Sequence, residues 1–125
     1  LSIEGEKHGI RVNALAPTAA TRMTEGLIPE AVLKALEPQA VVPAMLVMAS
    51  EDAPNRTIIC AGAGSFEVAH ITLTQGVHLG TGPDTAERLL AAMAQVTERQ
   101  GEMVPRSGSE QGSLEVGKAM KAHGA

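Results

Sequence analysis

Three threonines at three-residue spacing, Thr18, Thr21 and Thr24, follow a short apolar run that stops at Pro17. Proline lacks an N–H group, so it ends the hydrogen-bond ladder of a strand without leaving a donor unpaired. Both residues between Thr18 and Thr21 are alanines, and a threonine hydroxyl can donate and accept hydrogen bonds. The pattern predicts a loop where backbone amides and a hydroxyl can approach a flat polar ligand. The alternative is an ordinary turn.

The other residues that could bind a metal or react chemically lack partners at a suitable spacing in the sequence. The histidines are His8, His70, His78 and His123. They show no metal-ligand spacing with each other or with Cys60, so the sequence predicts no metal site. Cys60 lies in an apolar run, where we expect it to pack as a small hydrophobic side chain.

The elements around the loop that carries Thr18, Thr21 and Thr24 read as an α/β arrangement. The apolar runs at residues 10–16 and 57–61 predict two strands, and residues 66–73 read as extended. Helical patterns at residues 29–38 and 39–50 lie between the two strands, with Pro43 in the first turn of the second helix. Residues 1–9 predict the end of a helix that Gly9 closes in a left-handed conformation.

This order of elements predicts a right-handed crossover between two parallel strands. A parallel sheet buries both faces and needs more strands than two. We therefore expect the last third of a larger doubly wound domain, and the alternative is a small α/β domain complete in itself. Because the chain begins with Leu1 rather than methionine, we also expect that residues upstream have been removed or left out.

Residues 81–125 differ in character and predict a helical extension with a flexible linker. Asp84 and Glu87 have the spacing of a capping box at a helix start, and the helix is expected to end at Gly101. Residues 104–113 read as the linker, and residues 114–123 as a short helix. The predicted organisation is therefore a first part at residues 1–80 and an extension at residues 81–125.

Composition excludes several classes of protein. The chain has 125 residues, 44% of them hydrophobic, which argues against disorder. Its net charge of -4, with no basic run, predicts no nucleic-acid partner. No apolar run reaches the length of a membrane helix, so no membrane partner is predicted. A single cysteine excludes an intrachain disulfide and fits a cytoplasmic location.

The sequence resembles a known family in three places: GEKHGIRVNALAP, ASEDAP and the glycine-containing CAGAGSF. These motifs look like the C-terminal part of the short-chain dehydrogenase/reductases, over residues 1 to about 80. The run from residue 16 to residue 54 looks closest to the (3R)-hydroxyacyl-CoA dehydrogenase units of peroxisomal multifunctional enzyme type 2 and their bacterial relatives. The resemblance implies a Rossmann-like parallel sheet and NAD or NADP as the cofactor.

The resemblance also implies roles for particular residues. In the family, groups after the proline hold the carboxamide of the nicotinamide ring, which assigns cofactor binding to Pro17, Thr18 and Thr21. Met23 and Leu27 are expected to line an acyl pocket, with simple packing as the alternative. The implied substrate is an acyl thioester or a related alcohol or ketone, and the family commonly forms homo-oligomers.

The family's catalytic residues do not occur in this sequence. Its chemistry needs a Tyr-x-x-x-Lys pair, and this chain has no tyrosine. The glycine-rich dinucleotide loop is also missing, because AGAGSFE has Glu67 at the third glycine position and no helical pattern after it. We therefore expect no hydride transfer by this chain alone.

Three hypotheses of function follow. The first is part of a hydroxyacyl or oxoacyl thioester oxidoreductase. The second is a non-catalytic remnant that serves as an oligomerisation or interaction module. The third is a different member of the family, such as an oxoacyl-carrier-protein reductase or a steroid dehydrogenase.

Overall fold

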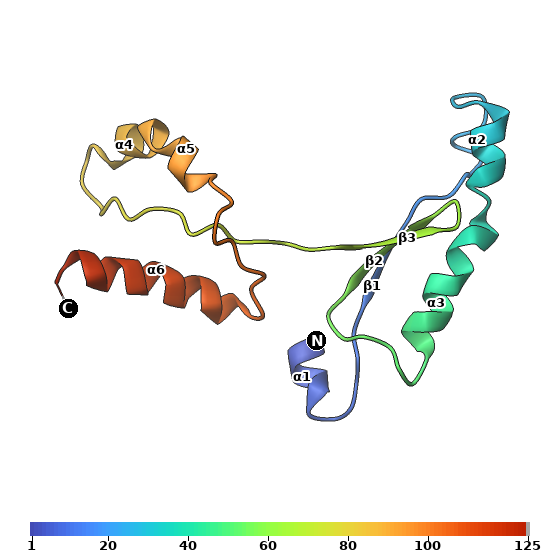
Figure 1. Ribbon diagram of the computed structural model, residues 1–125, viewed down its shortest axis with the longest axis horizontal. Coiled ribbons are helices and arrows are strands. Elements are labelled where there is room, and N and C mark those ends of the chain that lie inside the picture. The colour runs from blue at the N-terminus through green and yellow to red at the C-terminus, as the bar shows by residue number, and fades with distance from the viewer. Residues whose placement is uncertain (125) are drawn as a thin grey trace. The chain divides into compact units, whose positions relative to one another are not determined.

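The computed structural model describes residues 1–124, which form two compact units, Leu1–His70 (unit 1) and the chain from Ile71 onwards (unit 2). Unit 1 holds α1 (Ser2–Glu6), β1 (Ala14–Pro17), α2 (Glu30–Ala35), the 3-10 helix η1 (Pro38–Val41), α3 (Val42–Ala49), β2 (Ile58–Gly62) and β3 (Ser65–Ala69) (Figure 1). Unit 2 holds α4 (Thr85–Ala91), α5 (Met93–Val96) and α6 (Gly108–Ala122). The boundary expected near residue 80, between the family domain at residues 1–80 and its extension at residues 81–125, stays a prediction.

The sheet of unit 1 confirms the α/β class. Its order is β1-β2-β3, with β1 and β2 parallel and Pro17 in register with Ala61. The helices between β1 and β2 make the expected crossover. β3 continues the sheet antiparallel to β2 through a two-residue turn at Ala63 and Gly64. Both turn residues have positive φ, at 50° and 73°, as a type I′ hairpin requires.

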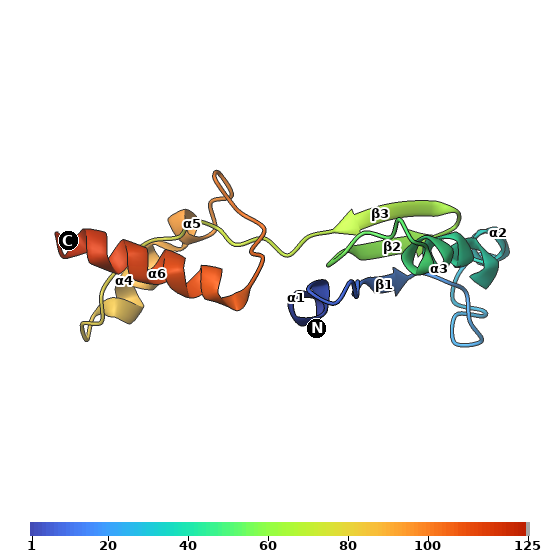
Figure 2. The same ribbon diagram turned by 90° about the horizontal axis from the view of Figure 1, so that it is seen from below.

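The small core of unit 1 lies between the helices and one face of the sheet. Val41 and Ala44, from η1 and α3, pack with Ala61 of β2, and Leu15 and Ile59 join them. Figure 2 shows α3 running beside the strands. Because side chains alternate along a strand, Ile58 and Cys60 point to the opposite face.

The described residues leave both edges of the sheet unpaired, at β1 and at β3, and the β1 edge bears on the site. The Ala14 N–H donates to the Thr57 carbonyl oxygen at 3.0 Å, and the Thr18 N–H donates to the Ala61 carbonyl oxygen at 2.8 Å. These groups point at β2, so the N–H and C=O of Leu15 point away from it. No strand among residues 1–124 pairs with that side of β1.

The accessible surface is large for the mass. The chain exposes 9357 Å² at 12.9 kDa. A compact monomer of this mass exposes about 6,300 Å², and two separate compact units that share the mass expose about 7,600 Å². Even the second comparison leaves roughly 1,700 Å² in excess, which is about twice one partner's share of a standard protein interface.

Several local predictions are confirmed. Pro43 lies in the first turn of α3, α2 begins directly after Pro29, and Gly9 has a φ of 70°.

No helix within residues 1–124 has the length and apolar character needed to cross a bilayer.

Unit 2 corrects three local predictions. The helix expected after Asp84 is split into α4 and α5, because the chain departs from helical geometry at Ala92. Asp84 precedes α4 without a capping hydrogen bond from its side chain, so the capping box does not form. α6 begins at Gly108, inside the stretch expected to be a linker, and runs for 15 residues.

Candidate functional site

The candidate site lies where β1 and β2 end. Because the strands are parallel, β1 and β2 end side by side, with Pro17 next to Ala61. The loop of residues 18–28 leaves from these carboxyl ends. Ligands of open α/β sheets bind outside the carboxyl ends of the strands. The register of β1 against β2 therefore decides where the loop starts.

Two asparagines set that register at the other end of the strands. Asn13 donates from Nδ2 to the Pro54 carbonyl oxygen at 2.8 Å and accepts from the Thr57 N–H at 3.0 Å. Asn55 accepts from the Val12 N–H at 2.9 Å. These bonds join segments more than 40 residues apart, and the sequence analysis did not identify either asparagine. The sequence indicated a structural role only for Asn13, whose amide side chain lies inside the apolar run at residues 10–16.

The loop after Pro17 is held from both sides. Its Thr18 N–H belongs to the ladder with Ala61, and its Ala20 N–H donates to the Leu36 carbonyl oxygen at 2.7 Å. Thr18 also lies very close to Gly62. A Cβ at Gly62 would stand 2.8 Å from the Thr18 carbonyl oxygen and 2.9 Å from its Cβ, so the close packing against Thr18 requires glycine there.

The threonine spacing is explained by a local turn. The Thr21 N–H donates to Thr24 Oγ1 at 3.0 Å, and that hydroxyl donates to the Thr21 carbonyl oxygen at 2.8 Å. Thr21 Oγ1 accepts from the Met23 N–H at 3.3 Å. Thr24 therefore shapes the loop, a role that the sequence analysis did not assign. Because Thr21 Oγ1 acts only as an acceptor in this bond, its hydroxyl can still donate a hydrogen bond.

The structure places the remaining predicted residues on the surface. Pro17 and Thr18 are exposed at the end of β1, while Met23 and Leu27 are 85% and 78% exposed on the same loop. Met23 and Leu27 are thus not part of the core of unit 1. Their role in binding an acyl chain stays a prediction.

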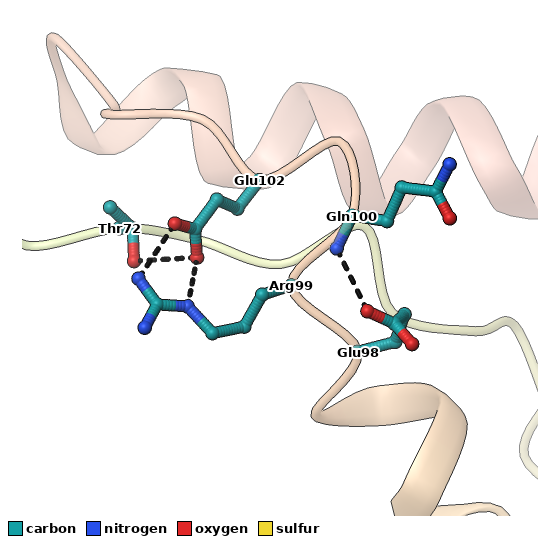
Figure 3. Close-up of polar contacts among 5 residues, drawn as sticks. All are labelled: Thr72, Glu98, Arg99, Gln100 and Glu102. Atoms are coloured by element: carbon teal, nitrogen blue, oxygen red, sulfur yellow. Dashed lines mark hydrogen bonds and ion pairs between the residues drawn. The ribbon is translucent and has the colours of Figure 1, made fainter.

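A second polar cluster lies in unit 2 and has a structural character. Arg99 and Glu102 form a two-point ion pair, with N–O distances of 2.9 Å and 2.8 Å, and Thr72 donates to Glu102 at 3.1 Å (Figure 3). The hydrogen bond from Arg99 lowers the pKa of the Glu102 carboxyl, and the same bond raises the pKa of Arg99. The pair fixes the extended segment beside Met103, whose N–H donates to the Leu73 carbonyl oxygen at 2.9 Å.

The histidines do not gather into a metal centre. Among residues 1–124, no group of three or more His, Cys, Asp or Glu side chains could hold a metal ion. His78 and His123 lie edge to face, with ring centroids 6.2 Å apart. Cys60 is a half-buried free thiol in β2.

Comparison with known proteins gives relatives of one kind. No family model matches the chain. A short-chain type dehydrogenase/reductase of Mycobacterium tuberculosis is 33% identical over 102 residues, which cover 81% of this chain and 35% of that protein. Peroxisomal multifunctional enzyme type 2 of Mus musculus is 42% identical over 65 residues, 51% of this chain and 9% of that protein. The chain thus spans about a third or less of the length of these relatives.

A solved structure supports the fold. Full-length peroxisomal multifunctional enzyme type 2 from Drosophila melanogaster matches with a TM-score of 0.77 and 22% identity, over 96% of this chain and 22% of that one. The matched residues include elements of unit 1 and elements of unit 2.

Proposed function

Because the homologues of this chain are short-chain dehydrogenase/reductases, with peroxisomal multifunctional enzyme type 2 among them, we propose that it forms the nicotinamide-side part of an NAD(P)-dependent oxidoreductase. The substrate is a hydroxyacyl or oxoacyl thioester, or a similar alcohol and ketone pair. One observation carries the proposal. The parallel register of Pro17 with Ala61 sets the loop that begins at Thr18 at the carboxyl end of two neighbouring strands.

The hydrogen-bonding groups of the loop fit a carboxamide. The N–H groups of Thr18, Ala20 and Thr21 are already donated within the protein. Among the described residues, the Ala19 N–H and the Thr18 hydroxyl have no partner, and the Thr21 hydroxyl can still donate. A carboxamide has an oxygen that accepts and an NH₂ that donates, so these groups complement it.

The chemical roles divide between this chain and the rest of such an enzyme. NAD or NADP, when bound, supplies or accepts the hydride. In this proposal Pro17, Thr18 and Thr21 hold the ring side of the cofactor, and Met23 and Leu27 contact the acyl part of the substrate. Proton transfer needs a Tyr-x-x-x-Lys pair, and the sequence has no tyrosine. The isolated chain is therefore inactive.

Fragment complementation tests the proposal. The 125-residue chain is mixed with a polypeptide that corresponds to the unmatched part of the Mycobacterium tuberculosis relative, chosen to contain a Tyr-x-x-x-Lys pair and a glycine-rich loop. Oxidation of NADH or NADPH is followed with acetoacetyl-CoA. We expect no turnover by either piece alone and turnover by the mixture. Turnover by the chain alone would refute the division of roles.

A pair of variants tests the assigned residue. Thr21→Val removes one hydroxyl that can donate, so the KM for the cofactor should rise about two- to tenfold in the complemented enzyme. The control is Thr97→Val, which removes a hydroxyl from unit 2 whose partner is the Met93 carbonyl oxygen. An unchanged KM in Thr21→Val, or an equal rise in the control, would remove Thr21 from the cofactor site.

The second candidate function is a non-catalytic interaction module. It is favoured by the surface excess and by an apolar groove of about 660 Å³ between α3 and the β2–β3 hairpin, which includes Val47, Ile59 and Phe66. Sedimentation of the chain distinguishes the two functions. Self-association without activity in the complementation assay supports the module, whereas complementation with the unmatched part supports the oxidoreductase. An upstream coding sequence with a Tyr-x-x-x-Lys pattern also supports the oxidoreductase.

The proposal also covers the cellular location, the oligomeric state and the partners of the protein. We place it in the cytoplasm as a homo-oligomer with a small-molecule substrate and without a nucleic-acid or membrane partner. The peroxisomal names belong to the relatives. Microscopy of the tagged chain in its own cells checks the location, and enrichment in an organelle would contradict it.

A further inference from the structure

The outer strand β3 presents a row of unpaired backbone groups. The Ala61 carbonyl oxygen accepts a hydrogen bond on the β1 side of β2, so the backbone groups of its neighbour Cys60 face β3. Cys60 is in register with Glu67, whose N–H and C=O therefore point at β2. Because these directions alternate along a strand, the N–H and C=O of Phe66 and Val68 point outward. No strand in the described part of the chain pairs with them, and Figure 2 shows β3 at the outer edge of the sheet.

The side chains along this edge are apolar. Phe66 and Val68 lie on the face of the sheet that α3 covers, and they are 47% and 50% exposed. Together with Val47 they line the apolar groove between α3 and the hairpin. Natural edge strands are usually protected by lysine, proline, a bulge or a covering element. β3 has the sequence SFEVA, without lysine or proline, so its edge is open to pairing with another strand.

The helix beside the groove also lacks cover. α3 consists entirely of apolar residues, yet Met45 and Leu46 are 56% and 66% exposed. A helix that is apolar on all sides is normally buried. The surplus of accessible surface, roughly 1,700 Å², is about twice one partner's share of a standard interface. The patch formed by β3, the groove and α3 therefore has room for one such interface, with surplus left for the β1 edge.

We propose that β3 pairs with β3 of a second copy of this chain, antiparallel and about a two-fold axis. Such an interface must be complementary to itself. A register centred on Val68 meets this condition, because it sets Glu67 opposite Ala69 of the other copy. A register centred on Glu67 would set two carboxylates directly opposite, which is destabilising. A register centred on Phe66 would set Val68 against the turn residue Gly64.

The pairing joins the two three-stranded sheets into one. The two Val68 residues exchange two hydrogen bonds at the axis, and Phe66 of each copy lies opposite His70 of the other. The axis is perpendicular to the sheet, so both α3 helices lie on the same face and the two apolar grooves meet over the β3–β3 pair. The inference rests on the homo-oligomer proposed above and names its interface. It does not depend on cofactor binding.

Sedimentation equilibrium of the full 125-residue chain tests the interface. We expect a species of twice 12.9 kDa at a chain concentration of about 100 μM. Val68→Pro removes the outward N–H from both copies and leaves the ladder with β2 intact, so the dimer should dissociate at least about 30-fold more readily. The matched control is Leu15→Pro, which removes an outward N–H from the open edge of β1. The control should leave the dimer unchanged.

Charge variants test the register. Residue 69 faces Glu67 of the other copy, so Ala69→Lys should tighten the dimer about three- to tenfold and Ala69→Glu should weaken it by a similar factor. Ser65→Lys places the same charge on the same face of β3, where no charged residue opposes it, and should change the affinity less than twofold. These variants alter only exposed side chains, so they decide the register even where Val68→Pro unfolds the hairpin.

Three results would overturn the inference. A chain that stays monomeric at about 100 μM would show that neither this interface nor the proposed homo-oligomer forms. A dimer that Val68→Pro leaves intact, or that Leu15→Pro weakens equally, would refute the β3 interface and leave the homo-oligomer standing. Equal effects of Ala69→Lys and Ala69→Glu would refute the register. Turnover in the complementation assay reports on the cofactor loop separately from all three.

Discussion

Asn13 is expected to hold β1 in register, and its removal has a calculable effect. Its side chain makes two hydrogen bonds, to the Pro54 carbonyl oxygen at 2.8 Å and from the Thr57 N–H at 3.0 Å. Each is worth about 1 kcal/mol net, and both partners are left unpaired when the amide is removed. Asn13→Ala should therefore destabilise the β1–β2 pairing by about 2 kcal/mol, which corresponds to a factor of about 30 in the opening equilibrium.

Amide hydrogen exchange measures this opening residue by residue. The reporters are the N–H groups of Ala14 and Thr18, which donate across to β2, and we expect both to exchange about 30-fold faster in Asn13→Ala. The Met103 N–H in unit 2 serves as the internal reference and should not change. Asn55→Ala removes a single bond, to the Val12 N–H, so it should accelerate exchange only about fivefold.

Two results would refute this account of the register. Exchange at Ala14 and Thr18 that stays within twofold of the wild-type rate would show that the ladder does not depend on the amide. An equal acceleration at Met103 would show that Asn13→Ala opens the whole chain rather than the β1–β2 pair.

Three further predictions concern the hairpin, the loop contact and pH. Ala63→Asn should slow exchange in β3, because asparagine adopts positive φ more readily than alanine; faster exchange would contradict the turn assignment. Gly62→Ala should destabilise unit 1 by about 1–3 kcal/mol in urea unfolding, since its Cβ meets Thr18 at 2.8–2.9 Å, and a neutral effect would contradict the close contact. The pKa of Glu102 is lowered by its ion pair, so its contribution is present above the ordinary glutamate pKa and is lost as pH falls through the lowered value. The protection factor of the Met103 N–H, which is the exchange rate corrected for its intrinsic pH dependence, should fall as pH drops over that acidic range, and in Glu102→Gln it should stay constant there.

The sequence predicted the elements whose patterns are local. Apolar runs located β1 and β2, Pro43 located the first turn of α3, and the stretch read as extended at residues 66–73 overlaps β3. Each depends on residues near one another in the chain, where proline, glycine and side-chain periodicity act directly on the backbone. The parallel pairing then followed from the order of elements.

The parts that could not be predicted depend on distant contacts or on weak local preferences. Asn13 acts on residues 41 and 44 positions away, and nothing near it in the sequence indicates its partners. Thr24 takes the Thr21 N–H through a turn that competes with other local hydrogen bonds. α6 begins at Gly108 in a glycine- and serine-rich stretch, where helix propensity is low and packing in the folded chain decides the outcome.

The hydrogen bonds that the loop has already made decide which groups it can still offer to a ligand. The protein itself takes the N–H groups of Thr18 and Thr21, so beside Pro17 the loop still offers the Ala19 N–H and the hydroxyls of Thr18 and Thr21. A planar amide needs one donor and one or two acceptors, which these groups supply. We therefore propose this loop for the nicotinamide end of a dinucleotide. The sequence points the same way, because it has the family's RVNALAP motif but not its glycine-rich pyrophosphate loop.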